Sequence, residues 1–218
     1  MSKRQAILAE RQYCVETLRG LKQSEWLAMT LCDGWTIEDL AAHLIVRERG
    51  GLGARAGIVL PFWYSKHEIA IQQMKHIGHK QLIHRLAKPP AWIPLFGPNL
   101  VEFYIHNEDV LRGELKRKRQ LPELVEQELA SFVPLLSRFA WRRVEGAFRL
   151  VLHDSFTNEV HEQVIGRAHH GVDVPELRLT GRPGEFLLLF MGRARAARLQ
   201  VEGDMAARRI YEAADIGV

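Results

Sequence analysis

The spacing of apolar residues changes once along this 218-residue chain, near Gly146. Before Gly146 the apolar residues recur every three to four positions, which is the period of an amphipathic helix. After it, Phe148 and Leu150 begin an alternation of apolar and polar residues, which is the period of a β-strand. A run of helices followed by strands is typical of the α+β class. We therefore predict a helical bundle over residues 1–143 and a small α+β domain over residues 144–218.

Five segments of the first domain have helical spacing, with start or stop signals at their ends. They cover residues 5–21, 36–50, 63–87, 98–113 and 121–142. Thr36, with Asp39 three residues later, is expected to cap the second segment. Gly78 is expected to interrupt the third segment, and Pro134 to kink or break the fifth.

The second domain is expected to mix short strands and helices. Strands are predicted over residues 148–152, 160–165, 177–180 and 198–201, and helices from Pro183 to Met191 and from Gly203 onward. The stretch 181–185 is either an anion-accepting helix start or a plain turn before a helix, and the plain turn is the simpler interpretation. His153 and His161 lie on adjacent strands, but no carboxylate or cysteine set completes a metal site there.

The composition, 47% hydrophobic and 26% charged, is typical of a globular protein with a sizeable core. The N-terminal residues lack the charged region, apolar core and cleavage site of a signal peptide. No apolar run approaches the roughly 20 residues that a membrane span requires. We therefore expect a cytoplasmic protein without a membrane partner.

The net charge of +4 is spread along the chain, with one dense basic run over residues 116–119. We interpret this run as a solvated linker or helix end, because no aromatic residues that stack on bases are interleaved with it, and we expect no nucleic-acid partner. Cys14 and Cys32 have neither disulfide-framework nor zinc-finger spacing, so both are expected to be buried thiols.

The main functional clue lies in residues 98–113. On a helix, Glu102, His106 and Asp109 fall within an arc of about 60°, so the three side chains lie on one stripe. A carboxylate and imidazoles suit zinc or a similar divalent ion. Chance alone would supply about one acid-to-histidine spacing of four in this composition, and a solvent-facing stripe remains an alternative. Apolar residues on both sides of the stripe favour a position inside the bundle.

A third metal ligand is available in the segment 36–50. His43 lies beside its apolar stripe, with Asp39 and Arg47 four residues away on either side. Under the functional interpretation, His43 completes the ligand set and Arg47 anchors an anionic substrate group. Under the alternative, His43 sits at the core boundary and Arg47 forms a surface ion pair. Asp39 is expected to act as a helix cap, and Asp109 is a candidate for orienting His106 from outside the ligand shell.

These residues lie in stretches that resemble a known family. LCDGWTIEDLAAHLIVRER and VEFYIHNEDVLRG are similar to the two ligand-bearing helices of the mycothiol-dependent maleylpyruvate isomerase N-terminal domain. That domain belongs to the DinB/YfiT-like metal-binding four-helix bundles. LTGRPGEFLLLFMGR and LQVEGD resemble the small C-terminal domain that accompanies this bundle and is related to sterol-carrier-like α+β folds.

The resemblance implies a divalent metal, zinc in the first place, held by His43, Glu102 and His106. It also implies a low-molecular-weight, mycothiol-like thiol as cosubstrate. The expected activity is that of a thiol S-transferase or isomerase acting on a small electrophile, in a monomer or homodimer. The alternative is a non-catalytic metal-binding module whose C-terminal domain holds an apolar ligand or a partner. The histidines of residues 63–87 match no substrate motif and are expected to be exposed or interhelical.

Overall fold

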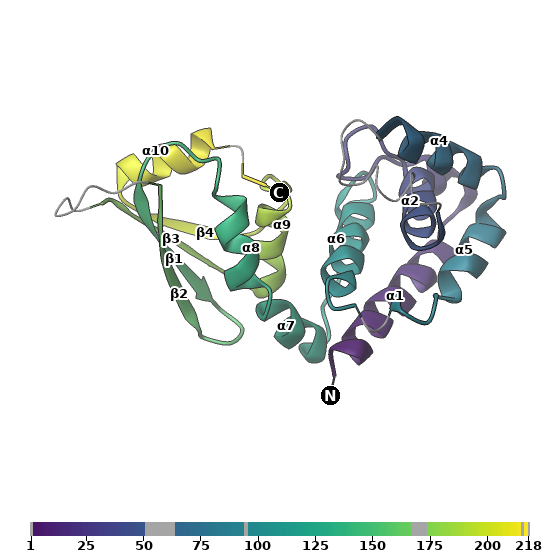
Figure 1. Ribbon diagram of the computed structural model, residues 1–218, viewed down its shortest axis with the longest axis horizontal. Helices are drawn as coiled ribbons and strands as arrows, with labels where there is room; N and C mark the ends of the chain where they lie inside the picture. Colours follow the sequence, from purple (N-terminus) through teal and green to yellow (C-terminus); the bar gives the residue numbers. More distant parts are fainter. Residues whose placement is uncertain (1, 51–63, 94–95, 167–173, 215, 218) are drawn as a thin grey trace. The chain divides into compact units, whose positions relative to one another are not determined.

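The computed structural model describes residues 2–50, 64–93, 96–166, 174–214 and 216–217. The chain forms two compact units, Met1–Gln120 and Leu121–Val218. The first unit is helical within the described ranges, and the second combines helices with a four-stranded sheet (Figure 1). The predicted α+β class is therefore confirmed. None of the helices in the described ranges has both the length and the apolar content needed to span a bilayer.

The first unit is a helical bundle whose elements follow the predicted segments. Its helices are α1 (Lys3–Arg19), the short 3-10 helix η1 (Gln23–Leu27), α2 (Ile37–Arg49), α4 (Tyr64–Lys75), α5 (His79–Ala87) and α6 (Asn99–Arg112). Helix α1 packs against α5 and α6, and α2 packs against α4 and α5. The predicted break at Gly78 is confirmed, because this residue caps α5 with a φ of +80°, which glycine adopts without strain. The start of the predicted third segment lies outside the described residues.

The second unit is built on one sheet. Its elements are α7 (Glu123–Ala130), α8 (Val133–Ala140), β1 (Phe148–Asp154), β2 (Val160–Ile165), β3 (Glu176–Gly181), α9 (Pro183–Phe190), β4 (Gln200–Gly203) and α10 (Met205–Ala213). The strand order is β2-β1-β3-β4, with β1 and β3 parallel and both outer pairs antiparallel. In the register of β1 and β2, His161 pairs with Leu152 and His153 with Val160. The two histidines therefore point to opposite faces, which rules out a metal shared between them.

The boundary between the units lies earlier than the sequence suggested. The predicted division followed residue 143, whereas the compact units meet at Gln120–Leu121. Helices α7 and α8 pack against α9 of the second unit. The predicted fifth segment is two helices, broken just before Pro134, which occupies the first turn of α8.

Candidate metal centre

The start of α2 is fixed by a reciprocal cap. The Thr36 hydroxyl accepts a hydrogen bond from the Asp39 backbone N–H, and the Asp39 carboxylate accepts one from the Thr36 N–H at 3.0 Å. The same carboxylate pairs with Lys75 of α4 at 2.6 Å. Asp39 is therefore a capping residue, as predicted, and it also fixes α4 against α2. His43 follows one turn later on α2.

Helix α6 is buried along almost its whole length. All of its residues except Glu102 and Arg112 are buried, including His106 and Asp109. The Glu102 side chain is only 20% exposed. The stripe of Glu102, His106 and Asp109 is therefore not a solvent-facing one. Apolar residues on both sides of the stripe were the sequence signal for this placement, because such a helix buries more than one face.

Two imidazoles converge on one carboxylate oxygen. The Nε2 atom of His43 lies 3.4 Å from Oε1 of Glu102, and Nε2 of His106 lies 3.3 Å from the same oxygen. In a tetrahedral zinc site with bonds of 2.0–2.1 Å, neighbouring ligand atoms are about 3.3–3.4 Å apart. The three groups are thus spaced as ligands of one metal ion, and all three of their donor atoms lie within 4.8 Å of one another.

The protonation of His43 and Glu102 suits such a site. Burial lowers the pKa of His43 to about 4, although the hydrogen bond with Glu102 opposes this effect. Burial raises the pKa of Glu102, but hydrogen bonds from His106 and His43 and the charge of Arg47 outweigh it and hold this pKa well below its usual value. His43 is therefore neutral and Glu102 ionised near pH 7, which are the forms that bind metals.

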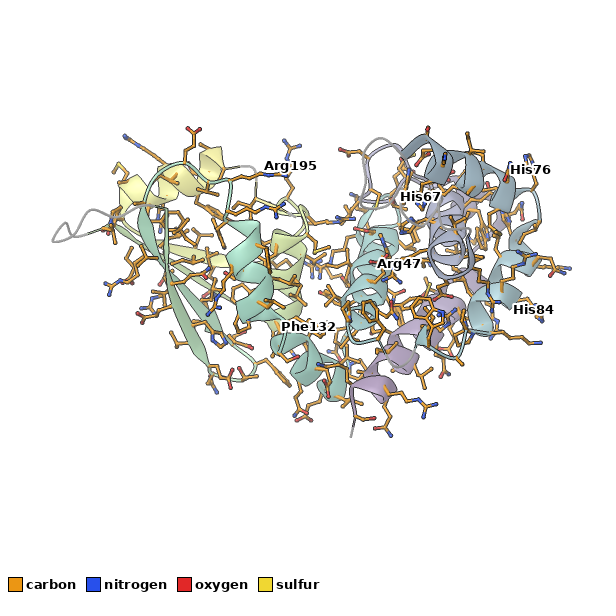
Figure 2. The ribbon with its side chains drawn as sticks, viewed as in Figure 1. Arg47, His67, His76, His84, Phe132 and Arg195 are labelled. Atoms are coloured by element: carbon orange, nitrogen blue, oxygen red, sulfur yellow. The ribbon has the colours of Figure 1, made fainter. Side chains whose placement is uncertain are left out.

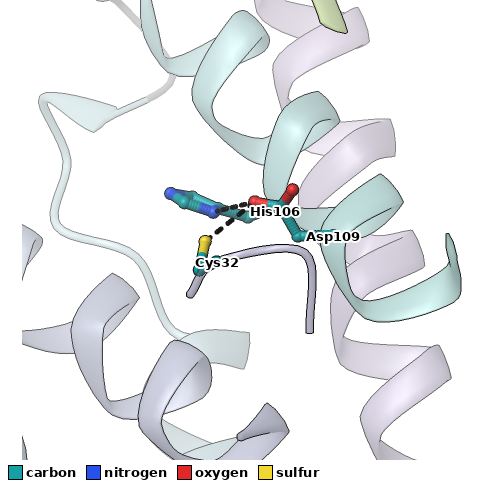
Figure 3. A group of neighbouring side chains, drawn as sticks. All are labelled: Cys32, His106 and Asp109. Atoms are coloured by element: carbon teal, nitrogen blue, oxygen red, sulfur yellow. Dashed lines mark hydrogen bonds and ion pairs between the residues drawn. The ribbon is translucent and has the colours of Figure 1, made fainter. Parts of the chain in front are cut away.

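The other edge of His106 faces a second group of side chains (Figure 3). Nδ1 of His106 lies 2.9 Å from Oδ2 of Asp109, and the Cys32 thiol donates to the same oxygen over 3.2 Å. Burial works to lower the pKa of His106, but hydrogen bonds with Asp109, Cys32 and Glu102 raise it well above the usual value. Cys32, His106 and Asp109 form a second set of closely spaced donor atoms. The His106 atom that faces this set is Nδ1, the ring nitrogen opposite the one that faces Glu102.

Arg47 contacts the centre itself. Its Nε donates to Oε1 of Glu102 over 3.0 Å, and its Nη1 donates to the Asn99 side-chain oxygen over 2.7 Å. These contacts join α2 to both ends of the first turn of α6. Arg47 therefore orients the Glu102 carboxylate, which the sequence interpretation had not foreseen. Its role as an anchor for an anionic substrate stays a prediction.

Two other residues, Cys32 and Arg119, behave differently from the sequence expectation. Cys14 is buried as predicted, whereas Cys32 is only partly buried and bonded to Asp109; neither forms a disulfide. Arg119, expected in a solvated run, is 5% exposed and pairs with Glu10 and Glu108. Long-range partners of this kind leave no local pattern in the sequence.

His67 of α4 is a further contributor that sequence reasoning did not assign to the centre. It is 2% exposed, and its Nε2 lies 2.8 Å from Nδ1 of His43. The only sequence signal was its position four residues before Ile71, a residue of the bundle core, on the face of α4 that packs inward. His76 and His84, which lie on the exposed surface, follow the expectation for this region (Figure 2).

Comparison with known proteins supports the resemblance seen in the sequence. Residues 7–88 match the family described as the mycothiol maleylpyruvate isomerase N-terminal domain. The match includes His43 and His67 and ends before α6. No curated protein matches the chain.

The fold is similar to two solved crystal structures. One is the mycothiol-dependent maleylpyruvate isomerase, with 14% identity and a TM-score of 0.57, and the other is a histidine-to-alanine mutant of that enzyme, with 15% identity and a TM-score of 0.56. Each alignment covers 92% of this chain and 91% of the other. At this identity the likeness shows the fold, and it extends over both units. The resemblance of this chain to the mycothiol-dependent maleylpyruvate isomerases is therefore confirmed.

Proposed function

We propose that this protein is a metal-dependent enzyme that uses a low-molecular-weight thiol, such as mycothiol. It either transfers the thiol to a small electrophile or isomerises that electrophile. His43, Glu102 and His106 are the proposed metal ligands, and zinc is the proposed metal. The observation that carries the proposal is the convergence of both Nε2 atoms on Oε1 of Glu102, at 3.4 and 3.3 Å. The names of the matching family and structures supply the thiol and the class of reaction.

The position of Asp109 favours a catalytic over a structural metal. A structural zinc site is closed by a fourth protein ligand, whereas a catalytic site keeps one position for water or substrate. Asp109 lies on the Nδ1 edge of His106, and the metal-like set formed by His43, Glu102 and His106 does not include it. Among the described residues, the proposed site therefore has three protein ligands, which leaves one coordination position of the metal for water or substrate.

The ligand set also fits the proposed chemistry. A bound zinc ion would deprotonate a coordinating thiol and so supply a nucleophilic thiolate at neutral pH. The residues of the chain prepare the site for this: His43 is neutral, Arg47 fixes the carboxylate of Glu102, and Asp109 fixes the ring of His106. We further propose a cytoplasmic location and a monomeric or homodimeric state.

Metal analysis of the purified protein tests the site. We expect about one zinc per chain in the wild type and in His84→Ala, which removes an exposed histidine of α5, and little zinc in His106→Ala. Equal zinc in all three proteins would contradict the proposed ligands. Thiol consumption should then be followed with mycothiol and a panel of electrophiles that includes maleylpyruvate. A protein that holds zinc at His106 but consumes no thiol with any electrophile would support the alternative, a non-catalytic metal-binding module.

A further inference from the structure

The two imidazoles of the proposed centre have different partners on their outer nitrogens. Nδ1 of His106 faces the carboxylate of Asp109, which is a common partner for a metal-bound histidine. Nδ1 of His43 faces another imidazole, Nε2 of His67, at 2.8 Å. His43 and His67 are 5% and 2% exposed, so water does not compete freely for this contact.

The tautomers of this histidine pair follow from the geometry. Nε2 of His43 points toward Glu102 and must keep its lone pair if it is to bind a metal. The proton of the neutral His43 ring is then on Nδ1, and this N–H donates a hydrogen bond to Nε2 of His67. Nε2 of His67 must therefore accept, which places the proton of a neutral His67 on its Nδ1. Only one arrangement of protons satisfies both the contact and metal binding.

The surrounding packing holds the two rings in this orientation. The rings of His43 and His67 meet edge to face, with centroids 5.0 Å apart and an interplanar angle of 81°. The indole of Trp35 lies beside both rings, with its centroid 4.9 Å from that of His43 and 6.4 Å from that of His67. One turn further along α4, Ile71 is fully buried in the bundle core. The packing of α4 on α2 therefore places His67 beside Nδ1 of His43.

We propose that His67 is a positioning residue for the metal centre: its Nε2 accepts a hydrogen bond from Nδ1–H of His43 and so holds Nε2 of His43 toward Glu102 and His106. This proposal rests on the proposed function, because it assumes that His43 is a metal ligand. Since outer partners of this kind affect metal affinity by about 10–100-fold, His67 should tune the centre without binding the metal.

The test compares two substitutions of His67 by the affinity for Co²⁺ and its visible absorption spectrum. Leucine cannot accept the hydrogen bond from His43, so His67→Leu should bind Co²⁺ about 10–100-fold more weakly and shift the spectrum. Glutamine carries an acceptor oxygen near the position of Nε2, so His67→Gln should restore most of the affinity and the wild-type spectrum. His84→Ala is the control and should behave as wild type.

Equal Co²⁺ affinity and spectra for His67→Leu and wild type would overturn the positioning role, provided that His43→Ala abolishes binding. If His43→Ala binds Co²⁺ as well as wild type, the proposed metal site itself is wrong, so the two failures are distinguishable. If His67→Leu does not fold, the imidazole nitrogen NMR signals of the zinc-loaded wild type show which nitrogen of His67 carries the proton. We expect His67 to carry its proton on Nδ1, and a proton on its Nε2 would overturn the proposal.

Discussion

Nδ1 of His106 lies 2.9 Å from Oδ2 of Asp109, on the ring edge opposite the nitrogen that faces Glu102. From this relationship we predict how metal binding changes when the carboxylate of Glu102 or of Asp109 is removed. Glu102 is placed to bind a metal directly, whereas Asp109 is placed to act through His106. The two residues stand seven positions apart on the same face of α6 and have different predicted roles.

Replacing Asp109 with asparagine should weaken metal binding without abolishing it. The amide keeps the size of the side chain but loses the charge that holds the His106 ring, for which we expect about 10–100-fold lower zinc affinity. Competition with a zinc-binding dye measures the change. Asp33→Asn, which alters an exposed carboxylate beside Cys32, should leave the affinity unchanged. Complete loss of binding in Asp109→Asn, equal to that in Glu102→Gln, would contradict the indirect role.

Metal binding should stabilise the first unit, because the proposed ligands come from two helices, α2 and α6, and are not brought together in the unfolded chain. Zinc at a free concentration of 100 times its dissociation constant should add about 2.7 kcal/mol to the free energy of unfolding. Thermal unfolding with zinc or with a chelator measures this stabilisation. His43→Ala should show no zinc-dependent shift, and an equal shift in that variant would mean that the metal binds elsewhere.

The two cysteines should differ in reactivity in the folded protein. Cys14 is 4% exposed, and burial raises its pKa to about 12, so it carries almost no thiolate at pH 8. Cys32 is partly exposed. Brief alkylation with iodoacetamide followed by mass spectrometry should modify Cys32 and spare Cys14, and Cys32→Ser should remain unmodified. Comparable modification of Cys14 in the folded chain would show that the Cys14 thiol is accessible and not buried.

Arg119 should be important for stability, unlike its neighbours in the basic run. Its guanidinium donates to Glu10 at 2.8 Å and to Glu108 at 2.6 Å, and it lies over the ring of Tyr13. Removing it leaves two buried carboxylates short of a partner, for which we expect Arg119→Met to lose about 3–5 kcal/mol of unfolding free energy. Urea denaturation followed by tryptophan fluorescence measures the loss. The exposed Lys118, replaced by methionine, is the control, and similar stabilities for the two variants would contradict this account.

The elements were largely predictable because each has local signals. Thr36 with Asp39 marked the start of α2, Gly78 the break before α5, and the alternation after Gly146 the first strand. The boundary between the units was not predictable in this way. Helices α7 and α8 have ordinary helical spacing, and only their packing on α9 assigns them to the second unit.

The centre was predictable in part for the same reason. Glu102 and His106 share one helix face, so their spacing is visible in the sequence. His43 was a candidate third ligand from its place beside the apolar stripe of its own segment, and the family resemblance supported it. The outer contacts join residues far apart in the chain: His67 with His43, Cys32 with Asp109, and Arg47 with Asn99. Such pairs depend on how helices pack, which a single sequence does not reveal.

The most direct test is an anomalous-difference map from crystals of the zinc-loaded protein. We predict one zinc per chain, bonded to Nε2 of His43 and Nε2 of His106 at about 2.0–2.1 Å and to the Glu102 carboxylate at about 2.0–2.2 Å. Asp109 should remain bonded to Nδ1 of His106 without contacting the metal. A zinc ion bound instead by Cys32, Asp109 and Nδ1 of His106, or no zinc at this place, would contradict the account.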